Sequence, residues 1–246
     1  MRTYKRTLAA VVCALAASSS HATATVDAIF SGTAFTSFGY DEVRITRPND
    51  TPITTYAGRF QGSGLNPVGV SSSIFVDSLS QLFAYCYDIY EYTYWNQKNT
   101  YAINLDGETG RTLDFLGAVN SVLNQGKSKY DNFAWLHPEN GFQGAAIQLG
   151  IWESKYDSTD LWDLANGSFR VIADAPIATE TQRWLDLFAD AIGGSDSLNG
   201  DYVMVLENSG VQDMITGDPP TVPEPGSLAL LGLGLGGLLW ARNRRA

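Results

Sequence analysis

Histidine and cysteine are scarce in this chain, with two of each among 246 residues. His21 and Cys13 lie near the N-terminus, so the rest of the chain holds only His137 and Cys86. One cysteine cannot form an internal disulfide, and one histidine allows at most one Ser-His-Asp catalytic triad. Zinc bound by Cys86 and His137 would lack two of its usual four ligands. We therefore expect no metal and no other cofactor, and we expect His137, beside a proline, in a loop between helices.

Basic residues are also few, at 16 against 26 acidic residues. Six of the basic residues and one of the acids lie in the two terminal segments described below. The middle of the chain therefore holds ten basic and twenty-five acidic residues, a net charge of −15. Such a charge opposes binding to nucleic acid or anionic lipid, and it is compatible with cations and neutral glycans.

Ionisable side chains are missing altogether from the sixteen residues between Gly226 and Ala241. About 20 apolar residues cross a hydrocarbon core of roughly 30 Å, so this run is short for a permanent anchor and sufficient for a transient or strained insertion. Arginines follow it directly and would stay in the cytoplasm under the positive-inside rule. Everything upstream would then lie across the membrane.

This order of features resembles the PEP-CTERM sorting signal of bacterial exported proteins: a Pro-Glu-Pro motif, an apolar helix and an arginine cluster. The residues concerned are Val222, Pro223, Glu224, Pro225, Arg242, Arg244 and Arg245. The resemblance implies processing near Pro-Glu-Pro by an exosortase-type membrane transpeptidase, in species that make exopolysaccharide. We assign residues 219–246 to this signal, with a transmembrane sorting helix that contacts the membrane before processing. An ordinary C-terminal anchor helix is the alternative.

The N-terminus has the three parts of a secretory signal peptide. A basic start precedes an apolar stretch from Leu8 to Ala17, and Ser20 and Ala22 supply small residues where a signal peptidase reads. We expect signal peptidase to cleave after Ala22, with Ala24 as the second choice. Residues 1–22 are therefore expected to be absent from the mature protein, which is exported across the inner membrane to the cell envelope, cell surface or extracellular matrix.

Residues 23–218 remain as one exported domain, long enough to bury a single core. Strand-like runs come first and helical patterns later, which predicts an α+β domain: a β-rich sandwich or barrel-like sheet with about three helices packed against it. The predicted strands are Thr25–Phe38, Glu42–Thr46, Ile53–Phe60, Ser72–Val76, Leu82–Ile89, Phe169–Ala173 and Tyr202–Leu206, with turns at Arg47–Asp50 and Gly62–Gly64. The predicted helices are Thr112–Asn124, Phe142–Lys155 and Ala178–Ile192.

Two short patches of this domain resemble the signature motifs of bacterial surface thioester domains. In that family an aromatic-Cys strand is joined covalently to the glutamine of a Thr-Gln-x-Ala-hydrophobic-Trp helix. The resemblance implies that Cys86 provides the sulfur and Gln148 the acyl carbon, with loss of ammonia, while Trp152 matches the motif tryptophan. Here Ile147 replaces the motif threonine and Gly150 its alanine.

The helical spacing fits such a bond. Gln148 shares a helix face with Gly144 one turn before it and Trp152 one turn after it. A small residue lets a strand approach closely, and the indole of Trp152 would shield a water-sensitive thioester. Attack by a nucleophile would release the Cys86 thiolate and leave the attacker acylated, so the chemistry runs once rather than turning over. The plain alternative is a glutamine that caps a backbone group beside a core tryptophan.

An aromatic-dense stretch surrounds Cys86: Tyr85, Tyr87, Tyr90, Tyr92, Tyr94 and Trp95. Strand alternation predicts Tyr85 and Tyr87 on one face, with the later tyrosines and Cys86 on the other. Tyrosine and tryptophan stack on sugar rings. The alternative function is therefore an extracellular carbohydrate-binding module that uses this patch, with Cys86 only a buried core residue.

Two groups of acidic residues are weaker candidates for a functional site. Asp157, Asp160 and Asp163 are spaced by three, as on a solvated helix face or in a calcium loop, but they do not follow the Asp-x-Asp-x-Asp-Gly pattern. Asp88 and Glu91 are the candidate carboxylates of a secreted hydrolase, the least favoured hypothesis.

We thus predict a non-enzymatic surface or exopolysaccharide-matrix protein, with a role in adhesion or biofilm. Its thioester-like domain would mediate covalent or non-covalent attachment. Its expected partners are the exosortase-type transpeptidase, signal peptidase, and surface glycans or amine nucleophiles, with no nucleic acid.

Overall fold

The computed structural model describes residues 23–31, 41–157, 162–172 and 179–219. The expected signal peptide, its cleavage site at Ala22 and the expected transmembrane sorting helix lie outside these residues. Within the described ranges, no helix is both long enough and apolar enough to span a membrane.

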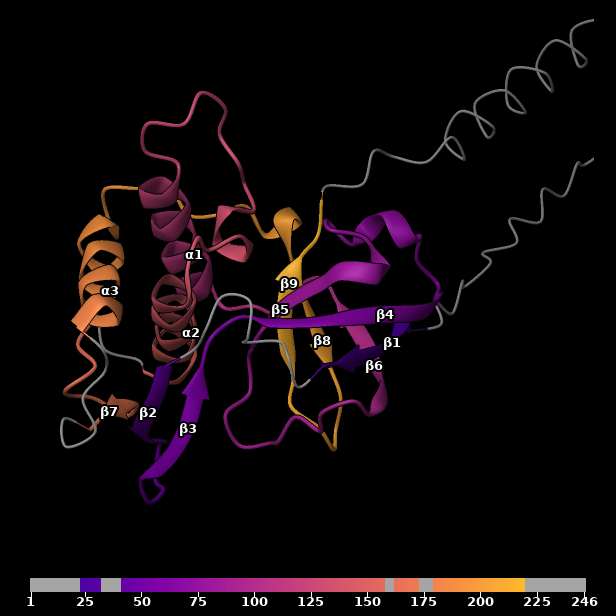
Figure 1. The fold of residues 1–246 in the computed structure, drawn as a ribbon, viewed down its shortest axis with the longest axis horizontal. Helices are drawn as coiled ribbons and strands as arrows, with labels where there is room; N and C mark the ends of the chain where they lie inside the picture. Colours follow the sequence, from indigo (N-terminus) through magenta and orange to yellow (C-terminus); the bar gives the residue numbers. More distant parts are fainter. Residues whose placement is uncertain (1–22, 32–40, 158–161, 173–178, 220–246) are drawn as a thin grey trace, which may run out of the picture.

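A closed six-stranded barrel forms one end of the domain, with strand order β1-β4-β5-β9-β8-β6 and every neighbouring pair antiparallel (Figure 1). Its strands are β1 (Thr25–Phe30), β4 (Phe60–Val68), β5 (Leu82–Cys86), β6 (Lys98–Asn104), β8 (Val203–Glu207) and β9 (Met214–Gly217). Closure removes the sheet edges that would otherwise expose unpaired backbone groups. Burial alternates along β1, whereas every residue of β5 is buried, because β5 packs against side chains on both of its faces.

Three helices and a small second sheet form the other end of the domain (Figure 1). The helices are α1 (Gly110–Leu123), α2 (Gly141–Tyr156) and α3 (Thr179–Ala191), and the small sheet has the order β3-β2-β7, with β2 (Asp41–Thr46), β3 (Ile53–Ala57) and β7 (Arg170–Val171). The three helices pack on one another, and α2 also packs on β2 and β3. The middle helix is therefore enclosed on several sides: α2 is buried without interruption from Gln143 to Ser154.

Side-chain caps set the starts of α1 and α2. The Thr109 hydroxyl accepts a hydrogen bond from the Thr112 backbone N–H, and the Asn140 side chain accepts one from the Gln143 N–H. Such caps satisfy backbone donors that the first turn of a helix leaves free.

The α+β class, the barrel-like sheet and the three helices are confirmed, with helix bounds within two residues of those predicted. Several strand predictions were wrong. Ser72–Val76 contains a 3₁₀ turn at Ser72–Ile74, and the strand predicted to Ile89 ends at Cys86. Strands β6 and β9 were missed.

The predicted turn at Gly62–Gly64 was also wrong, since these residues lie inside β4. A Cβ on Gly62 would stand 2.5 Å from the Ile29 carbonyl oxygen of β1. Glycine is needed here for a close approach of two strands, which a sequence pattern does not distinguish from a turn.

Gly150 has a packing role in the contact between α2 and α1. A Cβ at this position would lie 1.9 Å from the Phe115 ring of α1. Gly150→Ala is therefore expected to destabilise the domain by about 1–3 kcal/mol, because either α1 or the ring must move. Chemical denaturation followed by far-UV circular dichroism measures this change.

Gly110→Ala is the matched control, since no atom lies within 4 Å of a Cβ there and alanine favours a helix. It is expected to be neutral or stabilising. Equal unfolding free energies for Gly150→Ala and the wild type would contradict this account of the α1–α2 contact.

Candidate functional site

The candidate site lies where the barrel meets α2. Strand β5 pairs with β4 through Ala84 and Phe60, the first residue of β4, so β4 provides no ladder partner for Cys86. On its other side Cys86 is paired with Met214 of β9. The free backbone groups of Cys86 are buried and therefore need another partner.

Gln148 supplies that partner. The Cys86 backbone N–H donates to Gln148 Oε1 at 2.9 Å, and Gln148 Nε2 donates to the Cys86 carbonyl oxygen at 2.8 Å. One side-chain amide thus offers a donor and an acceptor, as a neighbouring strand would, and it ties the centre of α2 to the end of β5. The structure brings Cys86 and Gln148 together, as their expected roles require, while the thioester between them stays a prediction.

This joint is closed to solvent. Gln148 is 0% exposed and Cys86 is 3% exposed. Burial raises the pKa of the Cys86 thiol well above its ordinary value, and the nearby Asp88 adds to the rise. The thiol is therefore protonated at neutral pH and is a weak nucleophile towards external reagents.

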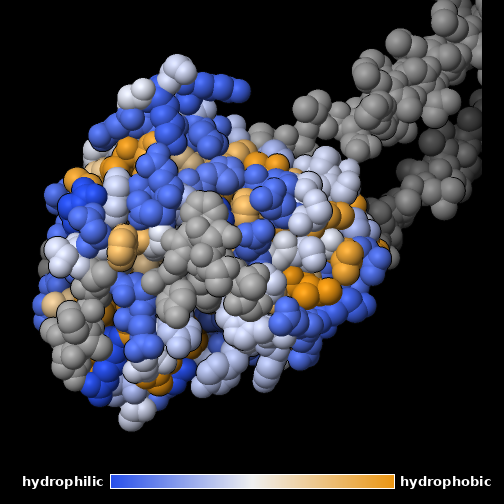
Figure 2. All heavy atoms as spheres, in the orientation of Figure 1, coloured by the Kyte–Doolittle hydropathy of each residue, from blue (hydrophilic) through white to orange (hydrophobic). Residues whose placement is uncertain are grey.

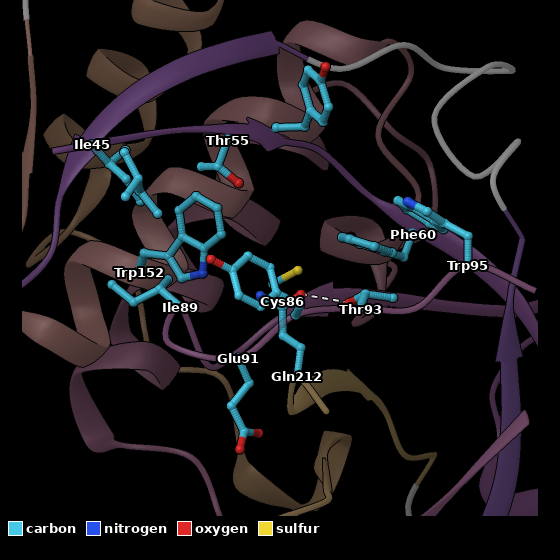
Figure 3. Close-up of a pocket in the computed structure, with 13 residues that line it drawn as sticks. Ile45, Thr55, Phe60, Cys86, Ile89, Glu91, Thr93, Trp95, Trp152 and Gln212 are labelled. Atoms are coloured by element: carbon cyan, nitrogen blue, oxygen red, sulfur yellow. Dashed lines mark hydrogen bonds between the residues drawn. The ribbon is translucent and has the colours of Figure 1, made fainter. Parts of the chain in front are cut away.

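Cys86 borders a pocket of about 170 Å³ between the barrel, the small sheet and α2 (Figure 3). The lining is mostly apolar and aromatic, and it comes from five parts of the chain: Ile45, Ile53, Thr55, Tyr56, Phe60, Cys86, Ile89, Glu91, Tyr92, Thr93, Trp95, Trp152 and Gln212. Among these residues Glu91 is the only one with a formal charge at neutral pH. The sequence analysis missed the pocket residues of the small sheet and Gln212. These side chains reach the pocket only through the tertiary fold, and no local sequence motif indicates this.

The segment after Cys86 crosses the pocket and is held by Gln212. Thr93 donates its hydroxyl to Gln212 Oε1 at 2.6 Å, and Gln212 Nε2 donates to the Asp88 carbonyl at 2.6 Å. The Trp95 ring stacks on Phe60 of β4 with centroids 5.3 Å apart. These contacts fix an aromatic wall beside Cys86.

The aromatic residues around Cys86 do not form the single patch that was predicted. Strand β5 ends at Cys86, so the alternation of side chains between two faces stops there. Tyr85 and Tyr87 are buried in the core, and the Tyr85 hydroxyl donates to the Trp135 carbonyl. Tyr92, Tyr94 and Trp95 are exposed, but only Tyr92 and Trp95 line the pocket.

Trp152 follows Gln148 by one helical turn, is 2% exposed and lines the same pocket as Cys86. Its indole nitrogen has no hydrogen-bond acceptor among the described residues. Figure 3 shows Trp152 and Cys86 among the side chains that surround this pocket. The placement suits the shielding role expected for it.

His137 lies away from this pocket, at the end of a 3₁₀ turn (Ala134–Leu136) between α1 and α2 as expected. Its Nε2 is 3.0 Å from the Asp77 carboxylate and its Nδ1 is 3.4 Å from Asp131. These contacts, with Asp77 the stronger, raise the pKa of His137. The histidine links the α1–α2 connection to the segment that contains Asp77, which is a structural role.

The other acidic candidates from the sequence are Asp157, Asp160, Asp163, Asp88 and Glu91. Among the described residues, no group of three or more His, Cys, Asp or Glu side chains is placed to hold a metal ion. Asp160 lies outside the described residues, while Asp157 is buried and accepts a hydrogen bond from the Ser168 N–H. Asp88 accepts from the Tyr90 N–H and does not share the pocket lined by Glu91.

A second pocket, of about 190 Å³, lies between the helices and is lined by Phe115, Glu153 and Leu185 among others. Glu153 is 1% exposed, and its nearest opposite charge is Arg111, 3.6 Å away. Burial, assisted by Asp157, raises the pKa of Glu153 to about 7, and Arg111 only partly opposes this rise.

Comparisons with known proteins identify one feature, outside the described residues. Residues 221–245 match the PEP-CTERM protein-sorting motif. The motif suggests an exported protein that is recognised and processed by an exosortase and reaches the cell envelope or surface. Comparison with curated proteins and with solved structures finds no match.

The raised pKa of Glu153 predicts a pH dependence of stability. Folding favours the protonated carboxyl, so this contribution is complete below the unfolded pKa of about 4.3 and is lost as pH rises through about 7. Glu153→Gln keeps the shape without the charge. Its melting temperature is expected to exceed that of the wild type at pH 8 and to approach it at pH 5, as differential scanning calorimetry across this range would show.

Burial also raises the pKa of Asp218 to about 7. The Glu153→Gln variant therefore keeps the part of the pH dependence of the melting temperature that comes from Asp218. Asp218→Asn is thus the matched comparison and should remove a separate part. A Glu153→Gln variant with the full wild-type slope would contradict the assignment.

Proposed function

We propose that this chain is an exosortase-processed protein of the cell envelope or exopolysaccharide matrix whose folded domain carries a Cys86–Gln148 thioester for covalent attachment. The domain acts once on each molecule and does not turn over. The observation that carries the proposal is the buried joint itself: the carboxamide of Gln148 is fixed by two hydrogen bonds to the residue that bears the thiol. Cys86 also lines a pocket, which would give a nucleophile its approach.

The reaction that forms the bond balances without any co-reactant. The sulfur of Cys86 adds to Gln148 Cδ, the tetrahedral intermediate expels Nε2, and the thiol proton leaves with it as ammonia. The Cys86 N–H that donates to Oε1 polarises the carbonyl towards this attack. Loss of Nε2 also removes the hydrogen bond that this nitrogen donates to the Cys86 carbonyl oxygen. The free energy lost with that bond must be offset by the release of ammonia and by burial of the acyl bond.

Attachment then follows from the chemistry of a thioester. A nucleophile that enters the pocket attacks Gln148 Cδ, breaks the bond to sulfur and remains joined to the glutamyl carbonyl as an amide or ester. The sorting motif delivers the domain to the cell envelope or surface, where amines and hydroxyls of neighbouring polymers are available. The high thiol pKa means that the departing sulfur must take up a proton, which the nucleophile itself can provide.

Intact-mass spectrometry of the exported protein tests this proposal. The wild type is expected to be lighter than its sequence by one ammonia and to show no thiol on denaturation. Methylamine should add to it and release the thiol. Cys86→Ala is a matched control, because both hydrogen bonds of Gln148 go to backbone atoms and survive the substitution.

The mass difference between the wild type and Cys86→Ala cancels any processing of the two termini. It should equal the substitution minus one ammonia. A difference equal to the substitution alone, with a wild-type thiol that reacts after unfolding, would refute the thioester.

A second candidate function is non-covalent recognition of a neutral saccharide in the pocket beside Cys86. The favouring observation is its lining, which joins the exposed faces of Tyr92 and Trp95 with the neutral polar groups of Thr55, Thr93 and Gln212. No lysine or arginine is among its described lining residues, which disfavours uronic acids and phosphorylated glycans.

Glycan-array binding and titration calorimetry test this candidate with the pair Trp95→Ala and Tyr94→Ala. Tyr94 is also exposed but does not line the pocket. Loss of stacking in Trp95→Ala is expected to weaken binding of a neutral glycan about tenfold, and Tyr94→Ala is expected to have no effect. Equal binding by Trp95→Ala and the wild type, or no bound glycan, would exclude it.

A further inference from the structure

Trp152 carries a hydrogen-bond donor that the folded protein does not use. Its Nε1 has no acceptor among the described residues, and the side chain is almost completely buried, so water does not replace the missing partner. A buried N–H without a partner is costly, and native proteins seldom keep one without a reason. The shielding role requires only the apolar surface of the ring and leaves this N–H unexplained.

The donor lies on the same helix as the glutamine whose carbonyl would react. Trp152 and Gln148 are four residues apart on one helix and share a face. Side chains on a helix lean towards its N-terminus, so the indole lies back over the turn that contains Gln148. Trp152 and Cys86 line the same pocket, so the indole and the residue that bears the sulfur belong to one site (Figure 3).

We propose that Trp152 Nε1–H donates a hydrogen bond to Oε1 of Gln148 when that oxygen becomes an oxyanion, and so acts as a catalytic residue of the thioester chemistry. The inference rests on the proposed thioester. The Cys86 N–H already donates to Oε1 in the resting state, and the indole supplies a second donor when charge develops. A donor held without an acceptor until the transition state stabilises that state selectively.

The step balances in electrons and protons. The lone pair of an attacking amine forms a bond to Gln148 Cδ, and the C=O π electrons move to Oε1, where both N–H groups meet the charge. Collapse restores the carbonyl and breaks the Cδ–Sγ bond. The sulfur leaves with the proton of the attacking nitrogen, so Cys86 ends as a thiol and Gln148 as a substituted amide.

The test compares reaction rates of purified full-length exported protein with methylamine, followed by intact mass. Trp152→Phe keeps an apolar ring and removes the N–H, and aminolysis is expected to slow by roughly a hundredfold. Hydrolysis of the thioester by water should slow as well, because it passes through the same oxyanion. A ring that only shields the bond predicts the reverse, with faster hydrolysis in Trp152→Phe.

Trp135→Phe is the matched control for the loss of a tryptophan. Trp135 carries a second buried indole N–H that has no acceptor among the described residues, and it does not line the pocket. This variant is expected to react at the wild-type rate. Unchanged or faster aminolysis in Trp152→Phe, or an equal loss in Trp135→Phe, would overturn the inference.

A benzothienylalanine at position 152 covers the case in which phenylalanine packs poorly, since it keeps the shape of the indole without the N–H. Slow aminolysis, or a smaller fraction of molecules that form the bond, supports the donor role. A wild-type rate in that variant overturns it. A wild-type protein whose mass shows no loss of ammonia refutes the proposed thioester, and the inference falls with it. A wild-type protein that has lost ammonia, together with a Trp152→Phe variant that reacts at the wild-type rate, refutes only the inference.

Discussion

The arrangement of the domain depends on a strand that extends beyond its neighbour. Strand β5 continues to Cys86, while the adjacent β4 begins opposite Ala84, so two buried backbone groups of Cys86 would have no partner in the sheet. The side-chain amide of Gln148 completes the ladder from α2. This contact joins the barrel to the helical end, and it ties the carboxamide of Gln148 to the backbone of the residue that bears the thiol, with both residues buried.

The remaining features of the site follow from that joint. Because α2 packs on the small sheet and on two other helices, most of its residues from Gln143 to Ser154 are buried apolar or small side chains. Gly150 makes room for Phe115, and Trp152 closes the wall beside Cys86. The segment held by Gln212 leaves a pocket on the sulfur side of the joint. A sorting motif that suggests export to the cell envelope or surface gives such a domain a setting in which attachment is useful.

The three helices were predicted to within two residues of their ends, because long runs with helical spacing are the clearest local pattern. The caps at Thr109 and Asn140 that set the starts of α1 and α2 are findings of the structure. The strands were predicted less well. The glycines of β4 resemble turn residues, and β6 and β9 lack strong alternation, so their places depend on partners far away in the chain. Cys86 and Gln148 were singled out by two short motifs. The pocket was not predictable, because Ile45, Trp95 and Gln212 meet only through long-range folding.

A high-resolution crystal structure of the exported protein would show whether Cys86 and Gln148 are covalently joined. A thioester gives continuous electron density between Cys86 Sγ and Gln148 Cδ, with no atom at the position of Nε2. Separate density for a thiol and an intact carboxamide hydrogen-bonded to both backbone groups of Cys86 would contradict the proposed thioester.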